Sequence, residues 1–238
     1  MLFDLISMIN NGEFVGAFLL LLSYAALILV MLPVHEFAHA FSADRLGDPT
    51  PRWNRRLTLR PQNHLDILGT IMILLVGFGY AKPVPVNPAN FKHPKKDMAI
   101  TAFCGPLSNL IMAVLSVVVF KAICFFTGET VIITSGSAIT ISSLWIYYCY
   151  IIFIEVFASI NLSLAVFNLL PIYPLDGSRI FAVFIPNRWM WKIEQYQMYI
   201  MIAVLVLLFT GALTIPLQFL RHIMGWVICT PLHLPNYF

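Results

Sequence analysis

The chain has 238 residues, of which 60% are apolar and only 11% are charged, and its mean hydropathy is +0.84. Soluble domains carry about 25% charged residues, so this composition excludes an ordinary soluble domain and predicts an integral membrane protein in a lipid bilayer. The net charge of +3 is modest and gives no support for a nucleic-acid partner.

The first predicted membrane helix, residues 14–43, carries the most informative motif of the chain. Its first twenty-one residues, 14–34, are uncharged and long enough to cross a hydrocarbon core of about 30 Å. His35 and His39 follow directly and share one helix face, so both imidazoles can reach one metal ion. With Glu36 they form the H-E-x-x-H pattern, in which the histidines bind zinc and the glutamate is the general base. The alternative, a purely structural polar cluster, is disfavoured because ionisable groups are costly beside a membrane span and usually mark function.

Residues 64–97 are predicted to form a re-entrant and extended element. Residues 67–81 are uncharged but are only fifteen in number, and basic residues flank them on both sides. We therefore expect this stretch to return to the side it came from. The proline-rich segment (residues 80–90) then favours extended backbone. It is either a stiff connector or a strand edge that pairs with a peptide substrate.

The basic residues predict the orientation of the chain. Twelve of the fourteen Lys and Arg residues fall into three connecting segments, which the positive-inside rule assigns to the cytoplasm. These residues are Arg45, Arg52, Arg55, Arg56 and Arg60; Lys82, Lys92, Lys95 and Lys96; and Arg179, Arg188 and Lys192. The amino terminus is then outside, and the active site faces the cytoplasmic side of a multi-pass protein of the cell membrane.

The second predicted span, residues 98–122, contains Gly105, Pro106 and Asn109. Glycine and proline permit close packing or a kink in a membrane helix, and Asn109 is a hydrogen-bonding group at membrane depth. Taken alone, Asn109 could simply join helices.

The third predicted span, residues 142–177, ends in a broken helix. Pro171 and Pro174 interrupt it, which a bilayer tolerates only beside protein or a wet cavity. Asp176 lies at this break on the same predicted side as the two histidines, and it is the natural third zinc ligand, leaving the fourth position for water. Glu155, within the span, lines a polar path or bonds to a neighbouring helix, and it is left unassigned with His64 and His93.

A fourth span is predicted over residues 195–220, followed by a tail, residues 221–238, that is either a short crossing or a surface helix. The predicted fold is an all-α polytopic membrane protein forming one membrane-embedded domain, residues 1–238. It has a re-entrant or extended element on the cytoplasmic side and additional C-terminal helices.

Three motifs in this order resemble the site-2 protease family (M50) of intramembrane zinc metalloproteases. They are His35-Glu36-x-x-His39, Gly105-Pro-Leu-x-Asn109 and Asn168-x-x-Pro171-x-x-Pro174-Leu-Asp176-Gly177. The resemblance is to a minimal bacterial form, because no stretch long enough for an inserted PDZ domain separates the motifs. It implies that residues 1–238 form a protease domain with a core of three transmembrane helices. It also implies that His35, His39 and Asp176 bind Zn²⁺ and that Glu36 is catalytic, whereas Asn109 and Asn168 contact substrate.

The predicted function is therefore hydrolysis of peptide bonds within or near transmembrane segments of membrane-protein substrates, by Glu-assisted attack of water. The competing prediction from another class is a multi-pass metal-ion transporter, since intramembrane His and acidic residues also build ion pathways. Transport requires further polar residues across the bilayer, and apart from Glu155 the spans offer few. An inactive scaffold is disfavoured because Glu36 and all three proposed ligands are present.

Overall fold

The computed structural model describes residues 2–76, 79–128, 131–134, 138–141, 143–186, 192, 195–212 and 214–229. In this part of the chain, three helical stretches are long and apolar enough to cross a membrane: Phe14–Arg45, Pro94–Thr127 and Leu144–Leu169. They carry exposed apolar side chains such as Phe18, Ile111 and Leu115, which suits contact with lipid. The prediction of a helical membrane protein with three core spans is confirmed.

The first span consists of α2 (Phe14–Ala26), the π-helix η1 (Leu27–Met31) and α3 (Leu32–Arg45). The second is the single helix α7 (Pro94–Thr127), which accommodates Pro106 in its interior. The third consists of α8 (Leu144–Tyr150), the π-helix η3 (Ile151–Ala158) and α9 (Ser159–Leu169). The remaining helices are α1 (Leu2–Asn10), α4 (Thr50–Trp53), α5 (Pro61–His64), α6 (Ile67–Val76), η2 (Pro88–Asn90), α10 (Asp176–Phe181), η4 (Ala182–Phe184), α12 (Gln197–Phe209) and α13 (Thr214–Cys229).

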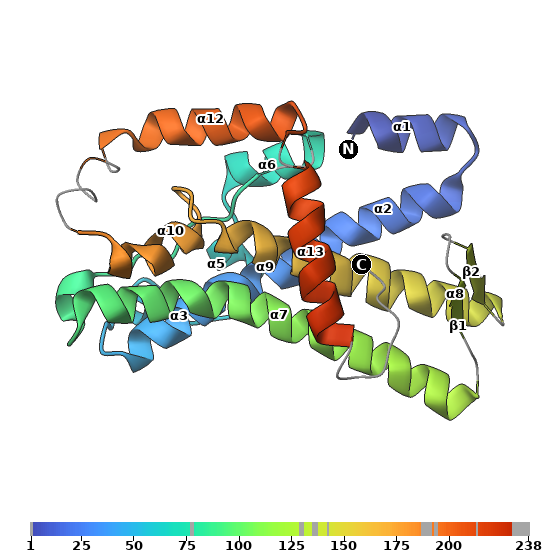
Figure 1. Cartoon of the computed structure of the whole chain (residues 1–238). Helices are drawn as coiled ribbons and strands as arrows, with labels where there is room; N and C mark the ends of the chain where they lie inside the picture. Colours follow the sequence, from blue (N-terminus) through green and yellow to red (C-terminus); the bar gives the residue numbers. More distant parts are fainter. Residues whose placement is uncertain are drawn as a thin grey trace. The chain divides into compact units, whose positions relative to one another are not determined.

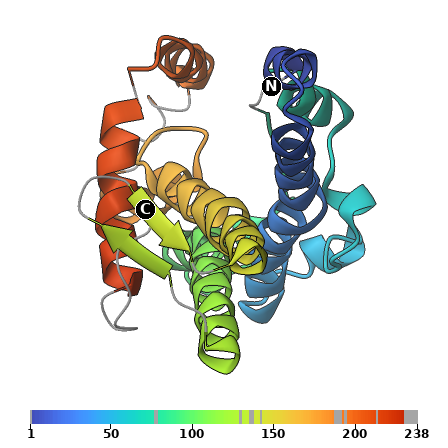
Figure 2. The same ribbon diagram turned by 90° about the vertical axis from the view of Figure 1, so that its right-hand side faces the viewer.

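The chain divides into two compact units, Met1–Ser108 with Leu169–Met198 and Asn109–Asn168 with Tyr199–Phe238. In the first unit, α3 contacts the short helices α4 and α5 that follow it. The chain reverses at Gly12, whose φ of 78° is readily adopted by glycine, so that α1 packs on α2 and lies next to α6 (Figure 2). Helices α3 and α10, which carry the predicted zinc ligands, both belong to this first unit.

Within the first unit, the ends of the re-entrant segment meet. Leu65 forms an antiparallel bridge with Ala81, and the Lys82 amide donates to the His64 carbonyl at 2.7 Å. Asp66 begins α6 by accepting a hydrogen bond from the amide of Gly69 at 2.9 Å. Residues 65 and 81 thus lie side by side, while the re-entrant path of the segment and its side of the membrane stay predictions.

The second unit is built on a core of apolar side chains from the second half of α7, from α8 to α9 and from α13. Phe120, Ile146, Ile154 and Leu162 are almost completely buried, and Ile228 of α13 joins them. Figure 1 shows α13 crossing these helices. The core explains why additional helices follow the three spans, because α13 covers apolar surface that the spans leave open.

Two predicted boundaries are wrong, and one element was missed. The span expected over residues 195–220 is two helices, α12 and α13, because Gly211 adopts a φ of 73° and ends the first helix. The third spanning helix ends at Leu169, and Asp176 instead begins α10. Strands β1 (Val131–Thr134) and β2 (Ala138–Ile141) form an unpredicted antiparallel hairpin. Residues 221–229 of the predicted tail continue α13, and residues 230–238 lie outside the described part.

We expect Gly69→Ala to lower the melting temperature of the detergent-solubilised protein. A Cβ at Gly69 would overlap the backbone carbonyl oxygen of Tyr80, and overpacking of this kind costs about 1–3 kcal/mol. Gly16→Ala is the matched control, because its Cβ would make ordinary contact with Met8 at 3.6 Å. Equal melting temperatures for both variants and the wild type would contradict this account of the re-entrant segment.

Candidate metal centre

His35 and His39 lie one turn apart on α3, and both are buried, with 5% and 8% of their surface exposed. Their Nε2 atoms are 3.1 Å apart, and the two rings meet edge to face. The spacing of four residues on an uninterrupted helix explains this convergence. Pro33, near the start of α3, does not disturb it, because the π-helix before it continues directly into α3.

Asp176, the first residue of α10, completes the cluster. Its Oδ2 atom lies 3.2 Å from Nε2 of His35 and 3.3 Å from Nε2 of His39. Gly177 lets α10 begin here, because a Cβ at this position would overlap the carbonyl oxygens of Leu169 and Leu170. The break after α9 therefore directs a carboxylate at the histidine pair.

The three donor atoms fit one zinc ion. Zinc binds imidazole nitrogen and carboxylate oxygen at about 2.0–2.1 Å, so the ligands of a tetrahedral site lie about 3.3 Å from one another. The three observed separations span 3.1–3.3 Å. Among the described residues, the buried Oδ2 atom of Asp176 has no partner in hydrogen-bonding geometry, as expected for an atom that faces a metal position. A tetrahedron with three protein ligands keeps one position for water or substrate.

The charge of Asp176 suits a metal ligand. Burial by itself raises the pKa of this carboxyl group. The neighbouring imidazoles outweigh burial and hold the pKa well below its usual range, and His39 has a larger effect than His35. The carboxylate is therefore ionised and available to bind a cation at neutral pH.

Helix α7 orients the cluster through its backbone. Nδ1 of His39 lies 2.8 Å from the carbonyl oxygen of Thr101, which makes Nδ1 the protonated nitrogen and leaves Nε2 free for a metal. One turn later, Gly105 lies directly against the two rings. A Cβ there would overlap Nε2 of His39 and lie 2.8 Å from Cε1 of His35. Glycine is therefore required for α7 to approach the histidines.

The other predicted site residues lie at defined places. Glu36 is half-buried on α3 next to His35. Asn109 is fully buried and lies one turn after Gly105 on α7. Asn168, near the end of α9, is half-buried and donates to the Leu164 carbonyl at 3.0 Å. Both asparagines belong to the second unit, so their roles toward substrate stay predictions.

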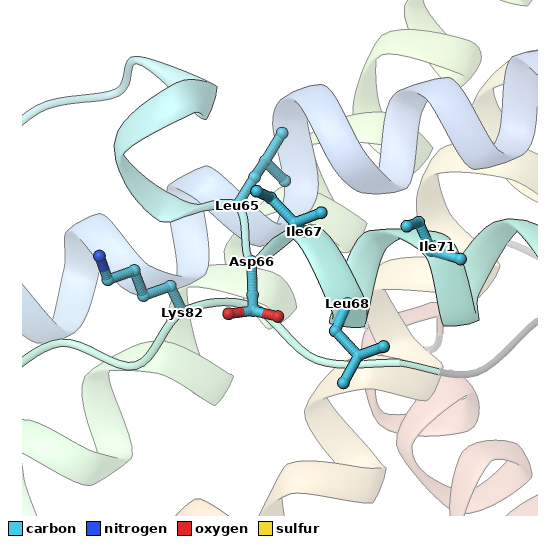
Figure 3. A pocket seen from close by; sticks show the side chains of 6 residues that line it. All are labelled: Leu65, Asp66, Ile67, Leu68, Ile71 and Lys82. Atoms are coloured by element: carbon cyan, nitrogen blue, oxygen red, sulfur yellow. The ribbon is translucent and has the colours of Figure 1, made fainter.

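An open hollow of about 440 Å³ lies in the first unit beside the start of the proline-rich segment. Figure 3 shows Asp66 and Lys82 among the apolar side chains of Leu65, Ile67, Leu68 and Ile71. Asp66 already serves as the cap of α6. The residues that line this hollow include none of the predicted site residues.

Comparison with known proteins identifies the class of this site. Residues 23–209 match the model of peptidase family M50. "Putative zinc metalloprotease YwhC" of Bacillus subtilis (strain 168) is 38% identical over 183 residues, which cover 77% of this chain and 78% of the relative. "Putative zinc metalloprotease Rip2" of Mycolicibacterium smegmatis is 31% identical over 170 residues, covering 69% of this chain and 57% of the relative. No solved structure matches the chain.

The family match and the two relatives, together with this donor set in a membrane protein, identify a zinc metalloprotease. The chain belongs to peptidase family M50. The predictions of the family, of a metalloprotease and of Zn²⁺ as the cofactor are confirmed.

The sequence reasoning missed two contributors to this site. It treated Gly105 as a packing residue, although its position in the G-P-L-x-N motif four residues before Asn109 signals a shared helix face. The role of the Thr101 carbonyl has no signal in the sequence, because every residue has a backbone carbonyl group.

We expect Gly105→Ala to abolish stoichiometric zinc binding, because the added methyl group would displace the His39 ring from its position. Metal content after purification, measured by mass spectrometry, tests this. Leu107→Ala, at a partly exposed position on the same helix, is the control and should keep about one zinc per chain. Full zinc occupancy in Gly105→Ala would show that α7 does not approach the histidines as described.

Proposed function

We propose that this protein is an intramembrane protease that hydrolyses peptide bonds within or near the transmembrane segments of membrane-protein substrates. The observation that carries the proposal is the convergence of His35, His39 and Asp176 at the end of a membrane-spanning helix. The relatives' names support zinc protease chemistry, and the three spans support a membrane setting for it.

In this proposal His35, His39 and Asp176 hold the zinc ion, and Glu36 is the general base. Zinc, when bound, supplies a Lewis acid that polarises the substrate carbonyl and acidifies water at its open position. Glu36 takes the proton of the attacking water and then donates it to the leaving amine. Support for this role comes from its place directly after His35 on α3, where its side chain is half-buried.

Asn109 is proposed to hydrogen-bond the substrate or the developing oxyanion, and Asn168 is proposed to help position the substrate. Support for Asn109 comes from its place one turn after Gly105, on the helix that lies against the histidines. A buried amide on this face offers donors that do not need to be desolvated during the reaction.

The substrate must present an extended peptide to the site. A transmembrane helix engages its carbonyl groups in its own hydrogen bonds, so it has to unwind locally before cleavage. In the proline-rich segment, Val84 and Val86 have amide and carbonyl groups with no hydrogen-bond partner among the described residues. These groups can pair with an unwound substrate strand.

The proposed substrates are single-pass membrane proteins, which the family resemblance suggests. The proposed orientation follows from the basic loops: the site faces the cytoplasm, and the amino terminus lies outside.

We expect Glu36→Gln to keep its zinc and to lose about 10²–10⁴-fold in kcat on synthetic transmembrane peptides that the wild type cuts. Loss of the base removes proton transfer but leaves all three ligands. Glu155→Gln, at an exposed carboxyl group within a span, is the control and should cut normally. If the wild type binds zinc, cuts no peptide and moves zinc into liposomes, the transporter alternative replaces the protease.

We expect Val84→Pro and Val86→Pro each to raise KM, because proline removes the amide that would pair with substrate. Peptide cleavage kinetics with quantified zinc content separates this effect from metal loss. Unchanged cleavage in both variants would argue against strand pairing and leave the segment as a connector.

A further inference from the structure

The feature that the proposed chemistry does not use is a fully buried acid, Asp48, just beyond the end of α3. Its amide donates to the carbonyl of Ala43 at 2.9 Å, which ties it to the last turn of α3. Its side chain is 0% exposed, and no Lys or Arg of the described chain forms an ion pair with it. A buried carboxylate without a cation must be satisfied by hydrogen bonds.

Four hydrogen bonds satisfy Asp48, and two of them come from the proline-rich segment. Thr50 donates its amide at 3.1 Å and its hydroxyl at 2.5 Å. The Asn87 amide donates at 2.7 Å, and Nδ2 of Asn90 donates at 2.6 Å. Burial alone raises the pKa of Asp48, but these donors outweigh burial and lower it. These bonds join Asn87 and Asn90, which lie 39 and 42 positions after Asp48 in the sequence, to the end of α3.

A second buried charge holds the other end of the same segment. Arg56 is 5% exposed and donates to the carbonyl oxygens of Asn63 at 2.6 Å, Lys82 at 3.1 Å and Pro83 at 3.3 Å. Burial lowers the pKa of this guanidinium, and the negative charge of Glu36 opposes that effect. The loop after α3 therefore holds the proline-rich segment at both ends.

Between these two anchors lie residues whose backbone groups have no hydrogen-bond partner in the described part of the chain. Pro83, Pro85 and Pro88 have no amide hydrogen, while the side chain of Val84 is buried and fixes which way the strand faces. The amides and carbonyls of Val84 and Val86 have no hydrogen-bond partner among the described residues, and Val86, which is partly exposed, is the more accessible of the two because Val84 as a whole residue is only 8% exposed. A strand held at both ends loses little further conformational entropy when a peptide pairs with it.

We propose that Asp48 is a positioning residue of proteolysis. It joins the proline-rich segment to the helix that carries both histidines, so that the free edge of Val84 and Val86 is held at a fixed place relative to the metal centre. The inference rests on the proposed function. It assigns to Asp48 an effect on substrate binding, transmitted through the segment, and no direct contact with the reacting atoms.

The test compares Asp48→Asn with wild type in the full-length, zinc-loaded protein. An asparagine amide in place of Oδ2 would face the Asn87 amide donor, and the loss of the negative charge would weaken the bond from Asn90 to Oδ1, so the segment should detach. We expect about one zinc per chain as in wild type, and faster amide hydrogen exchange within residues 84–90 at the hydrogen-bonded amides of Asn87, Ala89 and Asn90. On a synthetic transmembrane peptide that the wild type cuts, KM should rise about tenfold while kcat stays within about twofold, as for the loss of one charge-assisted hydrogen bond.

Asp44→Asn is the matched control. Asp44 lies on the last turn of α3 and pairs with Arg52 at 2.6 Å, and it makes no hydrogen bond to the proline-rich segment. Zinc content, exchange at residues 84–90, KM and kcat should all match the wild type in this variant. Asn90→Ala removes only one donor, and it should show the same pattern in weaker form even if Asp48→Asn does not fold.

The outcomes separate this inference from the proposed function. Unchanged exchange at residues 84–90 in Asp48→Asn and Asn90→Ala would overturn the anchor itself. Faster exchange with unchanged KM, or an equal fall in kcat and zinc content, would overturn the substrate role and make Asp48 purely structural. A wild type that cuts no peptide would overturn the proposed function and with it the role of the anchor, while exchange would still show whether the segment is held.

Discussion

The structure depends on bringing two imidazoles and one carboxylate within about 3.3 Å of one another in a chain that otherwise avoids polar groups. Without a cation these groups compete for the same small volume, and a buried charge without compensation is expensive. A single zinc ion would resolve this conflict, because it would satisfy all three donor atoms at once. The surrounding structure can be understood as the means of holding the three ligands at this separation.

The close approach of backbone segments largely determines the positions of the three ligands. Gly105 removes the side chain that would otherwise keep α7 away from His39, and Gly177 lets α10 start against the carbonyl groups that follow α9. The Thr101 carbonyl then fixes the His39 ring and its tautomer. A membrane protein has few polar side chains available to orient a ligand, so helix backbones take this role. Backbone groups have a similar role after α3. There the buried charges of Asp48 and Arg56 hold the proline-rich segment through its backbone groups and one amide side chain.

Much of this arrangement could be predicted from the sequence because lipid imposes simple rules. Long apolar runs must be helices, so three spans were found, and the few ionisable residues next to them pointed to His35, His39 and Asp176. The helix end at Gly211 is not predicted, because hydropathy alone does not show where a helix ends within a continuous apolar run. The hairpin of β1 and β2 lies in a stretch whose apolar residues suit a strand or a helix equally well. Asp48 and Arg56 could not be assigned, since their partners lie far along the chain and only the folded structure brings them together.

The most direct test of the central claim is X-ray absorption spectroscopy at the zinc edge of the purified wild-type protein. The account predicts a shell of four nitrogen and oxygen atoms at about 2.0–2.1 Å, with the outer-shell scattering of two imidazoles. Sulfur in the first shell would contradict it and would implicate a thiol such as Cys104, next to Gly105, as a ligand. A six-coordinate oxygen shell without imidazole scattering would equally exclude His35 and His39 as the zinc ligands.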